Sequence, residues 1–369
     1  MTVSRFRLCA FALFSVAVAF GAAAIDYSAS LKAGKAELKS AGALAFGPDG
    51  ILFVGDSVSA AIVAIDTGDR KAAAKAGPLE IKAVNEKIAA LLGTAPDQIL
   101  INDMVVNPIS RNTYLAVSRG RGPEATPVIL RVTPAGKIEE FSLDNVKSAR
   151  VAIPNAPDAQ AKDARGANRR MEAITDLAFV DGKVFVAGLS NEEFASNLRA
   201  IPFPFREADK GANVEIYHGQ HGRWETNSPV RTFVPYEIKK EAHLLAAYTC
   251  TPLVKFPIST LKPGTKVVGT TIAELGNRNR PLDMIIYKKA GNEYILMSNS
   301  SRGVMKMSTE KIDTFGAITQ QTERQGLSYE TIPELKGVEQ LDKYDDSSAL
   351  IVARLVEGGS LDLKTIALP

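Results

Sequence analysis

Residues 176–188 have the sequence DLAFVDGKVFVAG, and this stretch decides the fold. Two apolar runs separated by an Asp-Gly pair are typical of antiparallel strands joined by a tight turn. Three other stretches share this form, and two weaker copies complete the series. These copies begin at Ala43, Asp103, Asp283, Val230 and Val338.

Most copies continue with a third and a fourth strand-like run, such as residues 128–132 and 137–141. A repeated unit of four antiparallel strands is typical of a β-propeller blade. The sequence therefore predicts an all-β fold, a β-propeller of six four-stranded blades. Seven blades remain an alternative, because the longest interval between copies contains a polar stretch at residues 156–170. A pair of β-sandwiches would also have many short strands, but it would not explain repeated copies of one unit.

Residues 84–93 interrupt the strand pattern with the sequence VNEKIAALLG. Ile88, Leu91 and Leu92 would lie on one face of a helix. Gly93 would then end that helix. We therefore predict one short helical excursion between the first and second blades.

The last copy has only three strand-like runs after Val338. The segment 27–38, near the start of the mature chain, is free to supply a fourth strand. We therefore predict a single propeller domain over residues 25–369, closed by pairing of the N- and C-terminal segments.

The first 24 residues have the pattern of an export signal. Arg5 and Arg7 precede an apolar run at residues 8–20, and small residues follow at 21–24. The run is shorter than the roughly 20 residues that span a bilayer, so a cleaved signal is favoured over a membrane anchor. We expect the mature protein to be periplasmic or secreted.

The composition is that of an ordinary globular protein, with 46% hydrophobic and 23% charged residues. The formal net charge of +3 falls to +1 without the signal, because Arg5 and Arg7 lie in it and no acid does. A chain so close to neutral has no excess of positive charge that would favour binding to nucleic acid or to an anionic membrane surface. No later segment is long and apolar enough to span a bilayer. We expect a monomer whose partner is a small molecule or another protein.

The repeat also selects candidate site residues. In a propeller, the first strand of each blade begins, and the second strand ends, at the same face around the mouth of the central channel. First-strand starts supply three aspartates, second-strand ends supply five more polar residues, and one arginine follows shortly after a second strand. The candidates are Asp103, Asp176, Asp283, Asp56, Arg119, Asn191, Asn299, Arg354 and Arg302.

Three interpretations of this set are open. Carboxylate and amide oxygens suit a divalent cation such as Ca²⁺, and aspartates gathered in one ring would repel one another without a partner. Arg119, Arg302 and Arg354 could instead bind an anionic ligand through bidentate bonds. The third interpretation needs no ligand, because an aspartate at a strand start also accepts backbone N–H bonds as a local brace.

Cys250 is the one thiol that remains once the predicted signal is removed. A free thiol in an oxidising compartment is either buried in the protein or has a role such as metal binding. We interpret Cys250 as a buried residue. The alternative is a soft-metal ligand for copper, because Met297 lies near the end of the neighbouring blade's second strand.

His218 and His221 form an H-x-x-H pair in a glycine-containing connection. Such a pair can bind a transition metal, but we find no cysteine or acid at ligand spacing and interpret it as a surface turn. The chain also contains none of the common phosphate-loop, dinucleotide, haem-attachment or metalloprotease motifs.

The units at residues 48–56 and 176–187 resemble the blades of six-bladed propellers of the NHL and SMP-30 (gluconolactonase-like) type. The second family consists of lactone or ester hydrolases that hold a divalent cation on the channel axis through a Glu, two Asn and an Asp. The resemblance implies that three of these ligands have counterparts in this chain. They are Asn191, Asn299, and either Asp283 or Asp176.

The first hypothesis for function is an exported propeller that binds a small ligand, a metal ion or a partner protein at the mouth of its channel. The second, which the resemblance implies, is a divalent-metal-dependent lactonase or esterase. The third is a copper-binding or redox-associated protein that uses Cys250. The sequence leaves open whether the protein is an enzyme.

Overall fold

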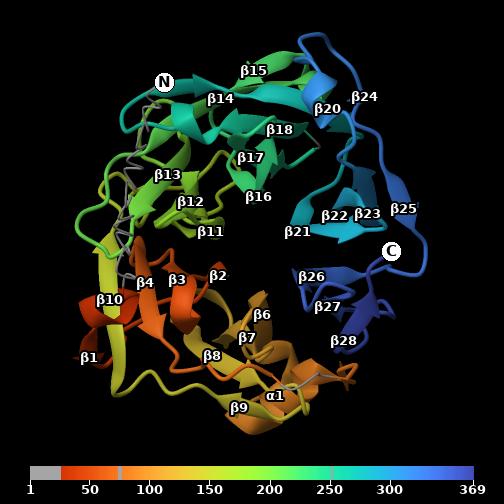
Figure 1. Ribbon diagram of the computed structural model, residues 1–369. Coiled ribbons are helices and arrows are strands. Elements are labelled where there is room, and N and C mark those ends of the chain that lie inside the picture. The colour runs from red at the N-terminus through yellow and green to blue at the C-terminus, as the bar shows by residue number, and fades with distance from the viewer. Residues whose placement is uncertain (1–25, 74–76, 251) are drawn as a thin grey trace, which may run out of the picture.

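Six small sheets surround a central channel in the computed structural model of the chain, which describes residues 26–73, 77–250 and 252–369 (Figure 1). Each sheet presents its innermost strand to the channel, and we number the blades one to six in the chain order of these strands. They are β2 (Leu44–Phe46), β6 (Ile99–Val106), β11 (Asp176–Val180), β16 (Val230–Ile238), β21 (Pro281–Lys289) and β26 (Val338–Lys343). The protein is therefore an all-β, six-bladed propeller, as the repeat predicts. The predicted signal at residues 1–24 lies outside the described residues.

The other strands continue each blade outward from the channel. Blade one adds β3 (Ile51–Asp56), β4 (Ala61–Asp66), β10 (Val146–Ala152) and β1 (Lys32–Gly34), and blade two adds β7 (Thr113–Arg119), β8 (Thr126–Val132) and β9 (Ile138–Glu140). Blade three adds β12 (Lys183–Leu189), β13 (Ser196–Pro202), β14 (Ala212–His218), β15 (Arg223–Glu225) and β19 (Lys266–Val268). Blade four adds β17 (Glu241–Tyr248), β18 (Pro252–Pro257), β20 (Thr270–Leu275) and β24 (Arg324–Gly326). Blade five adds β22 (Asn292–Asn299), β23 (Gly303–Ser308) and β25 (Glu330–Ile332), and blade six adds β27 (Ser348–Ala353), β28 (Asp362–Ala367) and β5 (Glu80–Ile81).

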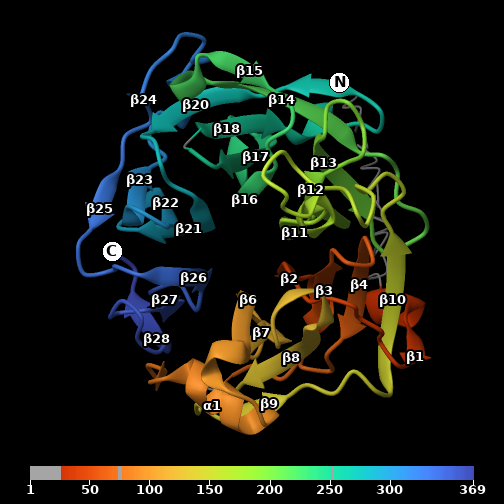
Figure 2. The same cartoon turned by 180° about the vertical axis from the view of Figure 1, so that it is seen from behind.

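The blades do not follow one another around the ring in chain order. The innermost strand of blade one contacts those of blades two and three, and blade two in turn contacts blade six. The chain therefore passes from blade one to blade two and then returns past blade one before it begins blade three (Figures 1 and 2). On the way back it forms β10, which pairs with β4 and completes blade one, with Val151 opposite Ile62.

The predicted closure by the two terminal segments is wrong. The fourth strand of blade six is β5, which pairs with β28 so that Ile81 lies opposite Leu363. The N-terminal strand β1 pairs instead with β10, at the outer edge of blade one. The reason lies in the order of the blades: blade two neighbours blade six, so the connection leading into blade two runs along the open edge of β28 and pairs with it.

The predicted helix is confirmed as α1 (Val84–Leu92). Gly93 ends it with a left-handed φ of +65°, a conformation that glycine adopts without a steric penalty. Ile88 and Leu92 are buried in the core shared with blades two and six. Leu91 was expected on the same face, but it is 47% exposed. Among the helices of the described residues, none is long and apolar enough to cross a membrane.

The second strand of a blade is buried on both faces because neighbouring blades pack against it, and every residue of β3 is buried. Phe53 of β3 packs against Phe179 and Phe203 of blade three, with ring centroids 5.7 and 4.9 Å away. Burial of such a side chain contributes about 1.5–3 kcal/mol to the free energy of unfolding.

The packing is tight at Gly188 of β12, where a Cβ would clash with the backbone carbonyl of Ala173.

Candidate functional site

The central channel contains a cavity of about 350 Å³, lined by a short run from each innermost strand. Its polar lining includes the predicted aspartates Asp103, Asp176 and Asp283. A fourth aspartate, Asp342 of blade six, lies with them and was not predicted from the sequence. The repeat therefore identified three of the four carboxylates that face the channel within the described residues.

All four carboxylates make the same pair of hydrogen bonds. One oxygen accepts from the next backbone N–H of its own strand, and the other accepts from the innermost strand of an adjacent blade. The donors are the N–H groups of Met104 and Leu44 to Asp103, Leu177 and Phe233 to Asp176, Met284 and Leu341 to Asp283, and Lys343 and Val106 to Asp342, at 2.6–2.9 Å. Each carboxylate thus connects two blades. The sequence suggested a local brace as one interpretation, but the second hydrogen bond of each carboxylate crosses to an adjacent blade.

Enclosure by the protein also changes the acidity of these groups. Burial raises the pKa of Asp176 to about 7 and that of Asp342 to about 6, although both carboxylates accept two N–H bonds. Burial, together with the charge of the neighbouring aspartates, raises the pKa of Asp103 and Asp283 well above the usual range. The ring is therefore a set of carboxyl groups that are protonated far more readily than surface aspartates.

The other predicted residues do not line this cavity. Asp56 is fully buried and accepts hydrogen bonds from residues 39, 40 and 59, so it braces its own loops. Asn299 donates to the Asn279 side chain at 2.8 Å, and Asn191 is exposed. The gluconolactonase-like set of two Asn and an Asp is therefore not gathered around the channel cavity.

Each of the three predicted arginines has a polar partner close to it in the propeller. Arg119 lies 3.4 Å from the Leu92 carbonyl oxygen, and Arg302 donates to the Asn277 carbonyl oxygen at 2.7 Å. Arg354 forms an ion pair with Glu339 at 3.0 Å. Their side chains belong to different blades and do not contact one another in the described structure.

Cys250 and Met297 have different surroundings. The interpretation of Cys250 as a buried residue is wrong, because its side chain is partly exposed in the turn after β17, where the residue has a left-handed φ of +59°. Met297 is fully buried in the apolar core between blades four and five, where it pairs with Met284 and Met305 on the neighbouring strands. That core does not include Cys250.

A compact group of metal-ligating side chains lies beside the Cys250 turn. His218 ends β14, the helical turn Gly219–His221 follows, and Glu225 ends β15. Glu225 Oε2 lies 2.9 Å from His218 Nδ1, and Glu225 Oε1 lies 2.6 Å from His221 Nδ1. One potential ligand atom from each of the three residues lies within 4.8 Å of the other two. We call these three residues the His-His-Glu cluster.

The cluster is half enclosed by protein. His218 is 2% exposed, whereas the His221 side chain is 40% exposed and opens to solvent. Burial opposes ionisation of both His218 and Glu225, but their mutual hydrogen bond and charge outweigh it. The pKa of Glu225 is therefore held well below its usual range, and that of His218 is raised.

Groups around the cluster hold it in place. The Cys250 carbonyl oxygen lies 3.4 Å from His218 Nε2, and Glu274 accepts a hydrogen bond from the Gly219 N–H at 2.6 Å. The turn that carries His218 and His221 was predicted from the sequence, but the third ligating side chain, Glu225, was not. The sequence pattern H-x-x-H-x-x-x-E contains all three residues, and the short β14–β15 hairpin brings the glutamate back to both histidines.

No protein-family model matches the chain, and no curated protein matches its sequence. Among solved structures, it is similar to the first two extracellular domains of Drosophila Semaphorin 1b, with 11% identity, a TM-score of 0.40, and coverage of 92% of this chain and 87% of that one. It is also similar to the PQQ-bound aldose sugar dehydrogenase of Streptomyces coelicolor, with 11% identity, a TM-score of 0.33, and coverage of 91% and 96%. A Thermus thermophilus oxidoreductase, assigned as a glucose dehydrogenase, matches with 11% identity, a TM-score of 0.33, and coverage of 91% and 100%. Likeness at this level concerns the propeller fold alone, and the resemblance to NHL and SMP-30 proteins stays a prediction.

Proposed function

We propose that this propeller binds a divalent transition-metal ion of the Zn²⁺ type through His218, His221 and Glu225. The observation that carries the proposal is the convergence of two imidazoles and one carboxylate, with ligand atoms within 4.8 Å of one another. Two histidines and a glutamate form a known ligand set for zinc, and other first-row metals use similar sets. Three protein ligands would leave a further coordination position for water or a bound molecule.

The surroundings of His218 support this assignment. A metal-binding histidine usually donates its second ring N–H to a carbonyl or carboxylate, which fixes the tautomer and the ring orientation. The Cys250 carbonyl oxygen, 3.4 Å from His218 Nε2, is placed to accept that hydrogen bond. Nδ1 is then the nitrogen that binds the ion, and it is the nitrogen that already faces Glu225.

The cluster also has a route to solvent, because the His221 side chain is exposed while His218 is buried. Exchange of an ion would therefore need no opening of the propeller. We further propose that the mature chain is exported, as its predicted signal at residues 1–24 implies. Metal binding is proposed in place of lactone hydrolysis, because Asn191 and Asn299 do not line the channel with the aspartates.

A second candidate is binding of a small cationic ligand or a divalent cation in the channel itself. It is favoured by the four carboxylates that line the cavity of about 350 Å³. The brace accounts for one hydrogen bond at each carboxylate oxygen, and such an oxygen can accept more than one. Binding of Ca²⁺ there would require Asp176 and its neighbours to be ionised.

Titration calorimetry of the purified protein with ZnCl₂ tests the first proposal. The wild type should bind one ion in a saturable manner, and His221→Ala and Glu225→Gln should each weaken binding by about 100-fold or more. His243→Asn is the matched control, because it replaces the one other histidine, whose Nδ1 bonds the Glu241 carbonyl oxygen. Absence of saturable binding, or equal affinity in Glu225→Gln and the wild type, would overturn the proposal.

A further inference from the structure

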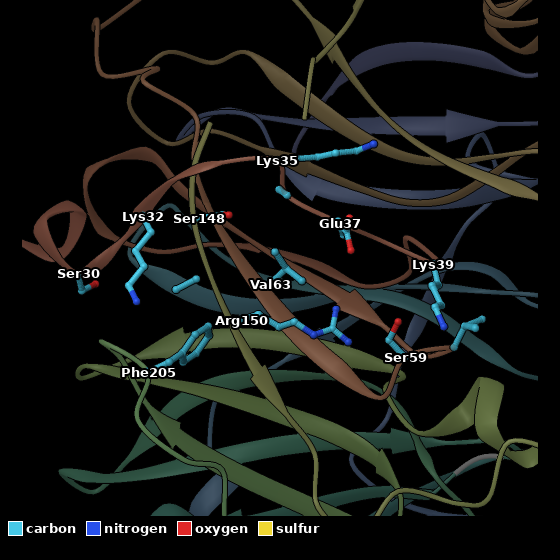
Figure 3. Close-up of a pocket in the computed structure, with 13 residues that line it drawn as sticks. Ser30, Lys32, Lys35, Glu37, Lys39, Ser59, Val63, Ser148, Arg150 and Phe205 are labelled. Carbon is cyan, nitrogen blue, oxygen red and sulfur yellow. The ribbon is translucent and has the colours of Figure 1, made fainter. Parts of the chain in front are cut away.

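A groove runs along the blade-one sheet where blade three approaches it, with a volume of about 820 Å³ (Figure 3). Its floor includes Val63 of β4 and Ala149 of β10. The groove depends on the return of the chain to blade one, because β10 and its hydrogen-bonded neighbour β1, with the loop after β1, supply most of its lining residues. We call it the blade-one groove. Its size is in the range that binds a ligand of several linked rings.

The charged side chains of the groove are mostly cationic. Lys32, Lys35, Lys39 and Arg150 line it, and Glu37 is the single acid among its lining residues. Figure 3 shows Lys32 and Arg150 along the groove and Lys39 at its far end. An excess of one sign of charge over a concave surface raises the local concentration of ions of the opposite sign.

Most of these cations have no carboxylate partner within the described part of the chain, and Arg150 has a distant one. None of the three lysines forms an ion pair there, whereas Arg150 forms an ion pair with Asp56 at 3.7 Å, near the upper limit for such a contact. Asp56 already accepts hydrogen bonds from the Lys39 N–H, from the N–H and hydroxyl of Ser40, and from the Ser59 N–H. The Arg150 side chain is 43% exposed and makes only this one long ion pair among the described residues, so its guanidinium keeps N–H donors for a ligand.

The uncharged lining adds two kinds of contact. The hydroxyl groups of Ser59 and Ser148 face the groove, and neither makes a hydrogen bond with another described residue. Phe205, from the loop after β13, is partly buried, with its ring centroid 6.0 and 5.0 Å from those of Phe53 and Phe203, and it lines the end of the groove near Lys32 (Figure 3). An aromatic ring can pack against the C–H face of a sugar ring, while serine hydroxyls bond its hydroxyl groups.

We propose that the blade-one groove binds an acidic oligosaccharide segment, in which sugar rings carry carboxylate or sulfate groups. Lys32, Lys39 and Arg150 bind the anionic groups along the chain, and Phe205 packs against one sugar ring at the end. Several separated cations suit a chain of repeated anionic groups better than a single small anion. This site lies apart from the His-His-Glu cluster and does not depend on a metal ion.

Fluorescence anisotropy with labelled oligosaccharides tests the proposal, in low-salt buffer containing EDTA so that metal binding plays no part. The probes are an oligogalacturonate, a heparin oligosaccharide, a neutral dextran oligosaccharide and a polyphosphate chain. The wild type should bind at least one acidic saccharide and not the dextran. The triple variant Lys32→Ala, Lys39→Ala, Arg150→Ala should weaken that binding by at least about 10-fold.

Two controls make the result decisive. The triple variant Lys240→Ala, Lys262→Ala, Lys336→Ala removes the same charge from exposed positions elsewhere, and its binding should be unchanged. Phe205→Leu should weaken saccharide binding and leave any polyphosphate binding unchanged. The proposal is overturned if no acidic saccharide binds, if both triple variants lose affinity equally, or if polyphosphate binds as tightly as the saccharides and Phe205→Leu has no effect.

Discussion

Replacement of Asp176 with asparagine should remove one of the four aspartate contributions to the pH dependence of folding stability. The pKa of Asp176 is about 7 in the folded protein, against 3.8 for an unperturbed side chain. The folded state therefore binds a proton more tightly than the unfolded chain does between these values. The stabilisation from this group is fully present at acidic pH and is lost as the pH rises through 7.

The size of the effect follows from the two pKa values. Between pH 8 and pH 5, proton linkage at Asp176 alone should raise the free energy of unfolding by about 3 kcal/mol. Asparagine cannot ionise, so its contribution does not change over this range. His218 and the other three channel aspartates, whose pKa values are also raised, change stability in the same direction but are present in both proteins. Because the Asp176 charge contributes to the raised pKa of Asp103 and Asp283, its removal lowers their pKa values and acts in the same direction as the loss of Asp176 itself.

Urea denaturation of the wild type and Asp176→Asn at pH 5 and pH 8 measures this difference. The stability of the variant relative to the wild type should be higher at pH 8 than at pH 5 by about 3 kcal/mol. Asp144→Asn, on an exposed loop, makes the same chemical change and should leave the pH dependence as it is in the wild type. If the free energy of unfolding changes between pH 5 and pH 8 by the same amount in the wild type and in Asp176→Asn, the raised pKa of this carboxyl and its burial are refuted.

Three further predictions concern other parts of the molecule. Asp103→Ala leaves two backbone N–H groups without their acceptor and should lower the free energy of unfolding by about 2–6 kcal/mol in urea melts; unchanged stability would contradict the brace. Zn²⁺ at 100 times its Kd should raise the Tm by about 4 °C in calorimetry, and the rise should be absent in Glu225→Gln. Gly188→Ala drives a Cβ into the Ala173 carbonyl and should cost about 1–3 kcal/mol, whereas an unchanged Tm would show that this contact relaxes freely.

Much of the fold could be predicted because a propeller repeats one local pattern. The hairpin of residues 176–188 forms β11 and β12, and Gly93 ends α1 as expected. The order of the blades could not be predicted, because equivalent copies carry no information about which of them are adjacent. The two-residue strand β5 also gives no apolar run, and its pairing with β28 joins parts of the chain that are far apart in sequence.

The candidate site was predicted in part for related reasons. Asp103 and Asp283 each follow an irregularity in strand register, and the first-strand alignment identified them. In blade six the equivalent position is Gln340, and Asp342 lies two residues further along the strand. Glu225 was missed because a hairpin of only three paired positions has no apolar pattern that would place it beside the histidines.

X-ray absorption spectroscopy at the zinc edge tests the central claim most directly, because it identifies the atoms bound to the ion. Protein loaded with one equivalent of Zn²⁺ should show two imidazole ligands with Zn–N distances of about 2.0–2.1 Å. His221→Ala should reduce the imidazole count to one, while His243→Asn should leave it at two. A spectrum with oxygen ligands alone, or one that is unchanged in His221→Ala, would contradict metal binding by the His-His-Glu cluster.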